Sequence, residues 1–120
     1  MKIAGAGFQE VNGVYDSVSR GGKIPAGFVR TCVQMGWDSV AMWKELYDDT
    51  APFYLHRDND SYIYRNKGDG RWWIDGPSGA GVYIISSRDK LPPSTSWSAL
   101  DKAHLPLPKV SVGAALSDLL

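Results

Sequence analysis

Residues 52–87 repeat one pattern of apolar and polar positions. Short runs rich in Tyr, Ile, Val and Trp alternate with clusters of Gly, Asn and Asp. Runs of this kind, bounded by residues that favour tight turns, are typical of antiparallel strands joined by hairpins. The pattern therefore predicts a β-meander with a central strand at Arg71–Asp75, and its other strands are Phe53–Arg57, Ser61–Arg65 and Gly81–Ser86.

The N-terminal residues continue this β character. Lys2–Ala4 and Val11–Val18 are predicted strands, and Tyr15 is expected in the core. Asn12 and Gly13 interrupt the second run, and Asn-Gly is a strong hairpin signal because both residues tolerate a positive φ. The segments expected after the meander are extended chain at Leu91–Pro93 and Leu105–Pro108, a last strand at Lys109–Val112, and a helical turn or ordered tail at 114–120.

Between these two regions, apolar residues recur at the spacing of a helix rather than of a strand. Val40, Trp43 and Tyr47 recur at helical intervals, and Asp38 precedes them as a candidate N-cap. Pro52 ends the pattern, because the residue before a proline disfavours helical backbone. We therefore expect one helix over residues 39–47, and no other.

The composition is that of one globular domain. The chain has 120 residues, of which 43% are hydrophobic and 22% charged, close to the averages of folded domains. Thirteen Gly and seven Pro favour many turns over long helices. We predict a mostly β domain over residues 1–120, in which an antiparallel meander of about five to seven strands forms a small sandwich or barrel beside the helix.

The charge pattern argues against several classes of partner. Thirteen basic and thirteen acidic residues are interspersed, without the basic stripe typical of proteins that bind nucleic acids or anionic membranes. No apolar run approaches the ~20 residues of a membrane span, and the first residues lack the apolar stretch of a signal peptide. Cys32 is the only cysteine, which excludes an internal disulfide. We expect a cytoplasmic protein that binds neither nucleic acid nor membrane.

Residues that could carry catalysis or metal binding are few and lack the required spacing. The glycine-rich start departs from the dinucleotide-binding pattern at Glu10. Neither His56 nor His104 is placed in the sequence to activate Cys32, and together these residues show no metal-ligand spacing. We therefore expect no catalytic residue, no metal and no cofactor.

Several short motifs resemble a known pattern when taken together. They are Gly5–Gly7, Glu10–Tyr15, Pro52–Tyr54, Ile63–Arg65, Trp72–Ile74, Tyr83, and Leu91–Pro93 followed by Trp97. Over residues 3–18 and 52–97 the chain is similar to a small uncharacterised domain in predicted proteins of protozoa, algae and related unicellular eukaryotes. The resemblance implies an all-β fold and assigns no activity. That pattern has a glycine where this chain has Ser96, and a short link where it has residues 26–51, which we interpret as a helical insertion.

The alternation of side chains divides the predicted central strand into two faces. Trp72 and Ile74 share one face, whereas Trp73 shares the other with a charged residue on each side. One interpretation packs Trp73 beneath the helix or the C-terminal segment. The other exposes it on an aromatic platform, a contact surface formed by Arg71, Trp73, Tyr62 and Tyr64.

The sequence therefore favours a non-catalytic module that binds a protein or peptide. Carbohydrate recognition by the same aromatic residues is a second hypothesis. A small enzyme is a third, and it requires Cys32, a histidine and a carboxylate to meet in one pocket. An exposed edge strand could also pair two copies of the chain. If Trp73 is shielded, the binding surface is expected in residues 26–51 or in Pro92–Pro108.

Overall fold

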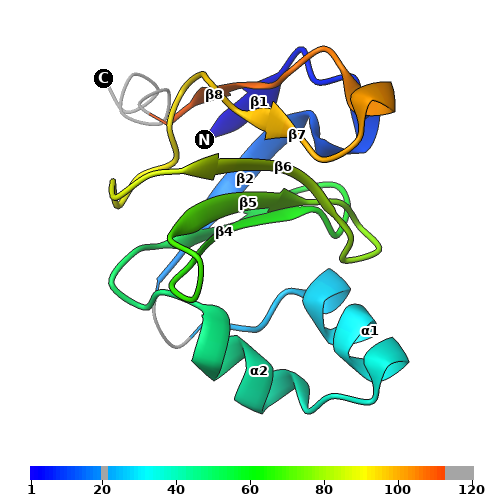
Figure 1. Ribbon diagram of the computed structural model, residues 1–120, viewed down its shortest axis with the longest axis vertical. Helices are drawn as coiled ribbons and strands as arrows, with labels where there is room; N and C mark the ends of the chain where they lie inside the picture. The colour runs from blue at the N-terminus through cyan, green and yellow to red at the C-terminus, as the bar shows by residue number, and fades with distance from the viewer. Residues whose placement is uncertain (20–21, 113–120) are drawn as a thin grey trace.

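The computed structural model describes residues 1–19 and 22–112, so the tail predicted at 114–120 lies outside the described residues. The strands of the described residues are β1 (Lys2–Ala4), β2 (Gly13–Val18), β3 (Phe53–His56), β4 (Tyr62–Asn66), β5 (Arg71–Asp75), β6 (Gly81–Ser86), β7 (Ser98–Ala99) and β8 (Lys109–Ser111). They form one antiparallel sheet in the order β7-β6-β5-β4-β3-β2-β1-β8, which curls into a half-barrel (Figure 1). The predicted mostly β, antiparallel fold is confirmed.

The meander from β3 to β6 follows the sequence pattern closely, whereas the N-terminal region differs from it. Residues Gln9–Val11 form a short 3-10 helix, so β2 begins only at Gly13. Asn12 does not turn a hairpin inside a strand. Its side chain accepts a hydrogen bond from the Ala6 backbone N–H and donates one to the Ala6 carbonyl, both at 3.0 Å, and so closes the β1–β2 connection.

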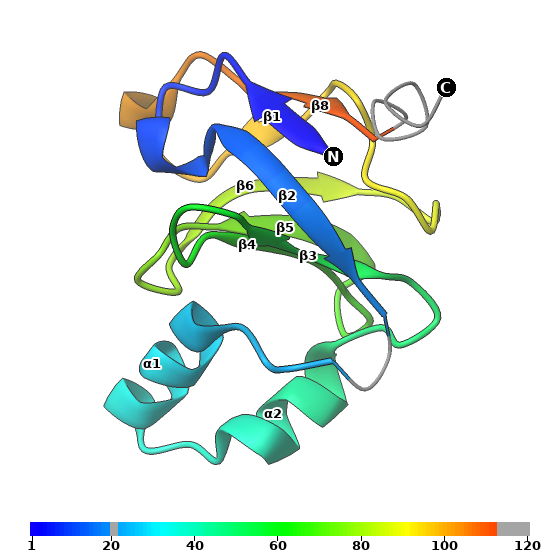
Figure 2. The same ribbon diagram turned by 180° about the vertical axis from the view of Figure 1, so that it is seen from behind.

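The inside of the curl encloses the larger of two hydrophobic clusters, which we call the inner cluster. Figures 1 and 2 show β1, β7 and β8 folded over one side of the central strands, with both helices on the other side. Trp72 and Ile74 are buried together in the inner cluster, as the alternation along the strand predicted, and Tyr15 is buried there too, as expected. A bulge breaks this alternation on β6, because Ile74 pairs with Tyr83 and Asp75 with Gly81, and Val82 therefore also points inward.

The two edges of the sheet are short. β7 has two residues and β8 has three. The sequence pattern predicted no strand at the position of β7. Beyond the edge, the Val110 N–H donates to the Ser94 carbonyl at 2.9 Å, which ties β8 to the segment before β7. Short and partly covered edges offer little template for pairing with another chain.

The insertion contains two helices, so the prediction of a single helix is wrong. α1 spans Ala26–Met35 and α2 spans Ser39–Leu46. α2 matches the predicted helix, and Asp38 caps it by accepting a hydrogen bond from the Ala41 N–H at 3.0 Å. α1 has no side-chain cap and is rich in β-branched residues, which have low helix propensity. No helix in the described ranges is long and apolar enough to cross a membrane.

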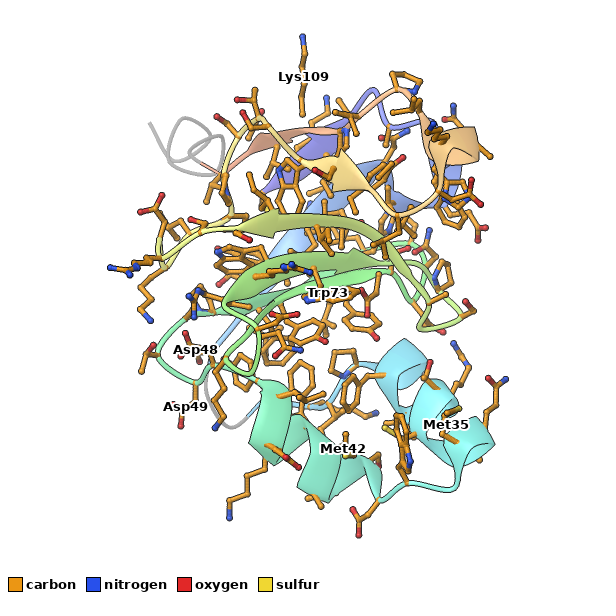
Figure 3. The ribbon with its side chains drawn as sticks, in the orientation of Figure 1. Met35, Met42, Asp48, Asp49, Trp73 and Lys109 are labelled. Carbon is orange, nitrogen blue, oxygen red and sulfur yellow. The ribbon has the colours of Figure 1, made fainter. Side chains whose placement is uncertain are left out.

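The two helices, which we call the helical hairpin, cover the outer face of the sheet over a second cluster. This helix-side cluster joins side chains of both helices to rings from β3 and β4; its buried members are Phe28, Cys32, Trp43, Tyr47, Phe53, Tyr62 and Tyr64. Figure 3 shows Met42 on the helix side of this layer, Trp73 on the sheet side, and Met35 on α1. The insertion therefore completes the core as well as adding surface.

Ser96 occupies a backbone conformation that suits glycine. Its φ is 73°, and it is the only non-glycine residue with positive φ among those described. Because this conformation costs an L-residue about 1 kcal/mol or more, Ser96→Gly is expected to raise the free energy of unfolding by about 0.5–1 kcal/mol in urea denaturation. The matched change Ser94→Gly, at a position without positive φ, is expected to lower it by a similar amount. A Ser96→Gly variant less stable than the wild type would contradict this account.

Candidate binding surface

Two residues of the predicted aromatic platform lie beneath the helices. Tyr62 is 1% exposed and Tyr64 is 5% exposed, and their rings stack with centroids 6.0 Å apart. Tyr64 also packs against Phe28 of α1 and Trp43 of α2. The expectation that these tyrosines are exposed is therefore wrong, and neither can contact a partner at the folded surface.

The other two platform residues reach the surface beside the helix-side cluster. Trp73 is half-buried and pairs directly with Tyr64 in the β4–β5 register. Its indole Nε1 donates to Asp69 Oδ2 at 2.9 Å, while Arg71 is exposed. Trp73 is thus partly packed against the helix-side cluster, as in the interpretation that places it beneath the helix. The four residues do not form one exposed platform.

The cover over the tyrosines was missed because α1 was not predicted. Phe28 and Cys32 are four residues apart and face the sheet together, which is the spacing of a helix face. Gly36, with φ of 73°, ends the helix in the left-handed conformation that glycine adopts easily. This pair of signals in the sequence could have revealed α1 and, with it, the burial of Tyr62 and Tyr64.

A buried carboxyl group lies next to Tyr62. Asp75 is 5% exposed and stands opposite Tyr62 in the β4–β5 register. Burial raises the pKa of Asp75 to about 7, although a hydrogen bond from the Tyr62 hydroxyl acts in the opposite direction. Within the described residues its Oδ1 has no hydrogen-bond partner. Asp75 lines neither of the two cavities described below, and its burial bears on the stability of the fold.

Cys32 and His56, the simplest pair for the enzyme hypothesis, lie at different clusters. Cys32 lies in the helix-side cluster, whereas the His56 ring packs edge-on against Tyr15 of the inner cluster. His56 also uses both ring nitrogens: Nε2 lies 2.8 Å from the Asn12 carbonyl oxygen, and Nδ1 accepts from the Asp58 N–H at 2.9 Å. Burial, followed by the charge of Asp38, raises the pKa of the Cys32 thiol, which disfavours the reactive thiolate.

The helical hairpin carries a group of exposed apolar side chains at its apex, which we call the apex patch. It consists of Val33, Met35, Trp37 and Val40, which are 70%, 57%, 47% and 64% exposed. They lie at the end of α1, in the turn, and in the first turn of α2. Four large apolar side chains exposed within residues 33–40 make this end of the hairpin a candidate contact surface.

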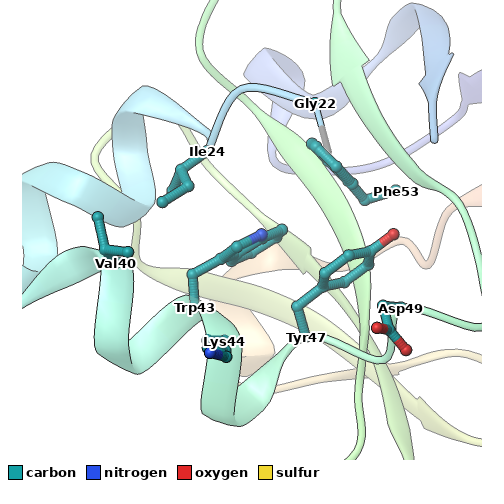
Figure 4. A pocket seen from close by; sticks show the side chains of 8 residues that line it. All are labelled: Gly22, Ile24, Val40, Trp43, Lys44, Tyr47, Asp49 and Phe53. Carbon is teal, nitrogen blue, oxygen red and sulfur yellow. The ribbon is translucent and has the colours of Figure 1, made fainter. Parts of the chain in front are cut away.

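A cavity of about 220 Å³, which we call the α2 cavity, lies beside the same helix (Figure 4). Its lining residues are Gly22, Ile24, Val40, Trp43, Lys44, Tyr47, Asp49 and Phe53. Val40 belongs to both the apex patch and this lining, so the two features are continuous. A second cavity of about 220 Å³ opens near Lys23, His56 and Asp60 and is more polar in its side chains.

The aromatic wall of the α2 cavity is held in place by ring contacts. Trp43 and Tyr47 stack with centroids 4.8 Å apart and planes 14° from parallel. Phe53 meets both rings edge-on, at 5.1 Å from Trp43 and 5.2 Å from Tyr47. The Tyr47 hydroxyl donates to the Ala51 carbonyl at 2.6 Å, which fixes its ring. The wall is therefore rigid and preformed.

An ion network anchors the end of the insertion next to this wall. Asp48 is buried and lies 2.8 Å from Arg65 Nη1 and 3.0 Å from Lys90 Nζ. Arg65 in turn donates to the Ser87 carbonyl through Nε at 3.1 Å and Nη2 at 3.0 Å. Figure 3 shows Asp48 beside the sheet and its neighbour Asp49 pointing away from it. The network joins α2, β4 and the segment after β6.

Comparisons of the chain with protein-family models, curated proteins and solved structures return no match. Among the described residues, no group of three or more His, Cys, Asp or Glu side chains could hold a metal ion. The candidate surface considered below consists of the apex patch and the α2 cavity.

Proposed function

We propose that the chain is a non-catalytic protein-binding module that uses the surface of its helical hairpin. The observation that carries this proposal is the apex patch, in which four large apolar side chains are each about half exposed or more. Trp37 stands at its centre in sequence, and tryptophan is among the residues that contribute most to binding energy at interfaces. The proposed binding surface therefore lies on residues 26–51 and not on the sheet face.

The charge of the chain indicates what kind of partner fits. Basic and acidic residues balance at thirteen each, and Asp38, Lys44 and Glu45 mix both signs close to the apex patch. Long-range electrostatic steering is therefore weak, and binding is expected to change little with salt. The proposed partner is an apolar or amphipathic peptide segment rather than a strongly charged chain.

The proposal includes a cytoplasmic setting, which the free Cys32 thiol supports. The carbohydrate hypothesis relied on coplanar, exposed rings of the sheet face. With Tyr62 and Tyr64 buried, that face does not present them.

A selection from a random peptide display library tests the proposal. The wild-type chain is expected to enrich peptides that bind at least tenfold more weakly to the double variant Val33→Lys with Trp37→Lys, because the charges interrupt the apolar contact. The matched control is Leu91→Lys with Leu105→Lys, which adds the same charge at two apolar residues, 54% and 52% exposed, outside the hairpin. The control is expected to bind as the wild type does.

Circular dichroism and thermal melting establish that both double variants are folded. The proposal fails if no peptide is enriched, or if the peptides bind the hairpin variant and the wild type equally. Loss of binding in the control variant alone would place the contact surface elsewhere and would equally overturn it.

A further inference from the structure

Asp75 is a carboxyl group enclosed beneath α1. It is 5% exposed, the Tyr62 hydroxyl donates to it, and its Oδ1 has no partner among the described residues. We propose that α1 is a proton-controlled cover, which stays closed over the helix-side cluster while Asp75 is protonated and opens about the turn at Gly36 when Asp75 loses its proton. The device does not depend on the proposed function, but it would regulate it, because Val33 and Met35 of the apex patch lie on α1.

The first part of α1 rests on the turn that follows Asp75. Figures 1 and 2 show the turn between β5 and β6 beside α1. Arg30 donates to the Pro77 carbonyl in this turn at 2.9 Å, and a second side chain of α1 donates to the next carbonyl at 3.3 Å. A Cβ at Gly27 would lie 3.0 Å from the ring of Tyr62, the partner of Asp75. The closed position of α1 therefore contributes to the burial of Asp75.

The two helices are attached to the sheet in different ways. The end of α2 is tied to the end of β4 through the backbone, because the Lys67 N–H donates to the Leu46 carbonyl at 2.8 Å and the Asp48 N–H donates to β4 at 2.9 Å. Among the described residues α1 has no such backbone bond to the sheet. It is held there by side chains, including an ion pair between Arg30 and Asp60 at 2.6 Å that is about half exposed. α1 can therefore leave the sheet while α2, with the cavity beside it, stays in place.

Among the described residues around Asp75, no other side chain changes its charge between pH 5.5 and pH 8. The titratable side chains packed around it are Tyr62 and Tyr64 of β4 and Cys32 of α1. Burial raises the pKa of each of these three above its usual value, so all three stay uncharged in this range. Arg30, the charged residue of α1, stays charged throughout and pairs with Asp60. The turn 76–80 has no titratable residue, and the residue opposite Asp75 on β6 is a glycine.

The loss of the proton favours the open state. Burial raises the pKa of Asp75 to about 7 in the closed state, whereas a carboxyl group in water has a pKa of about 4. Between these values the closed state binds more protons than the open state, so the opening constant rises by up to about tenfold per pH unit and levels off above pH 7. A helix of ten residues is not stable without tertiary contacts. Release of α1 therefore also exposes its amides to exchange.

Amide hydrogen exchange at pH 5.5 and pH 8 tests the inference, with each rate divided by that of an unstructured chain at the same pH. We expect the protection of the α1 amides from Val29 onward to fall at least tenfold between the two pH values. The amides of β4 and β5 are expected to stay at least tenfold better protected than those of α1 at both. In Asp75→Asn, which has the same shape and no charge, the protection of α1 is expected to change less than twofold.

A matched control separates weaker attachment from proton dependence. Asp60→Asn removes the ion pair with Arg30 and is expected to lower the protection of α1 by up to about fivefold at both pH values, with their ratio unchanged. His56, which lines the second cavity together with Ala26 of α1, is present in both variants. Alkylation of Cys32, the only cysteine of the chain, gives a second measurement. Its rate relative to that of the urea-unfolded chain is expected to rise with pH in the wild type and not in Asp75→Asn.

Three outcomes overturn the inference. The first is equal protection of α1 at both pH values, and the second is a fall that persists in Asp75→Asn. The third is equal protection of α1 and of β4 and β5 at each pH, because the opening would then be unfolding of the whole domain. No peptide enters these measurements, so their failure leaves the proposed function standing. A display selection without enriched peptides would in turn overturn the proposed function and leave the proton-controlled cover standing.

Discussion

Replacing Asp48 by alanine is expected to lower the free energy of unfolding by about 3–5 kcal/mol, measured by urea denaturation. Asp48 is buried and pairs with Arg65, whose side chain is only 12% exposed, and with Lys90. The variant leaves the Arg65 guanidinium buried without its carboxylate, which is the costly way to break such a pair. It also removes two hydrogen bonds that Asp48 Oδ1 accepts, one from the Thr50 backbone N–H at 3.0 Å and one from the Thr50 hydroxyl at 2.5 Å.

The effect is expected to depend on pH in one direction. Burial alone would raise the pKa of Asp48, but hydrogen bonds from Thr50, Lys90 and Arg65 outweigh it and hold the pKa well below its usual range. A depressed folded-state pKa contributes stability above the unfolded value of about 4, and that stability is lost as the pH falls below it. The difference between wild type and variant should therefore shrink in acid.

The matched control for this prediction is the neighbouring residue. Asp49→Ala removes the same charge from an exposed side chain that has no ion pair among the described residues. It is expected to change stability by no more than about 0.5 kcal/mol. If both substitutions change the free energy of unfolding equally, the ion pairs of Asp48 make no specific contribution to stability.

Replacing Asp75 by asparagine is expected to stabilise the protein above neutral pH, by about 2 kcal/mol or more. Asp75 is buried beside Tyr62, and burial raises its pKa to about 7. Above that pH the fold holds a charged carboxylate away from water, with Oδ1 lacking a partner among the described residues. Asparagine has the same shape and no charge, so it removes this cost.

The pH dependence again has a definite sign. Between the unfolded pKa of about 4 and the folded value of about 7, the native state binds more protons than the unfolded state, and stability falls as the pH rises. The variant should therefore be close to the wild type near pH 4, exceed it progressively up to about pH 7, and keep that lead at higher pH. Asp89→Asn, the same charge change at an exposed residue, is expected to show no such trend. A gap independent of pH would refute this assignment to Asp75.

The strands of the meander could be predicted because each is specified by residues next to one another in the sequence. Alternating residues and turn residues specify the four strands from β3 to β6 within a few positions. The same alternation correctly placed Trp72 and Ile74 on the inner face. Alternation does not hold through β6, where a bulge shifts the pattern by one residue and turns Val82 inward, because nothing in a single strand reveals the register of its neighbour.

The site could not be predicted in the same way, because it depends on what covers the sheet. The local pattern correctly placed Tyr62 and Tyr64 on one face, but their exposure is decided by α1 (Ala26–Met35), far earlier in the chain. α1 in turn is held by tertiary contacts: Arg30 donates to the Pro77 carbonyl at 2.9 Å, and Gly27 lies against Gly79. Packing overrides its low helix propensity, so propensity alone does not reveal it.

The insertion lies between β2 and β3, so the segment that carries the proposed surface is separate from the strands of the sheet. Val18 and Phe53, on either side of it, are paired residues of adjacent strands, so the segment between them leaves and re-enters the sheet at one point. Closing a loop costs only about 0.6 kcal/mol more for each doubling of its length. Other segments could therefore be exchanged at this point without altering the ladder, provided that they still shelter Tyr62 and Tyr64. The sheet can therefore stay the same while the segment inserted between β2 and β3 changes.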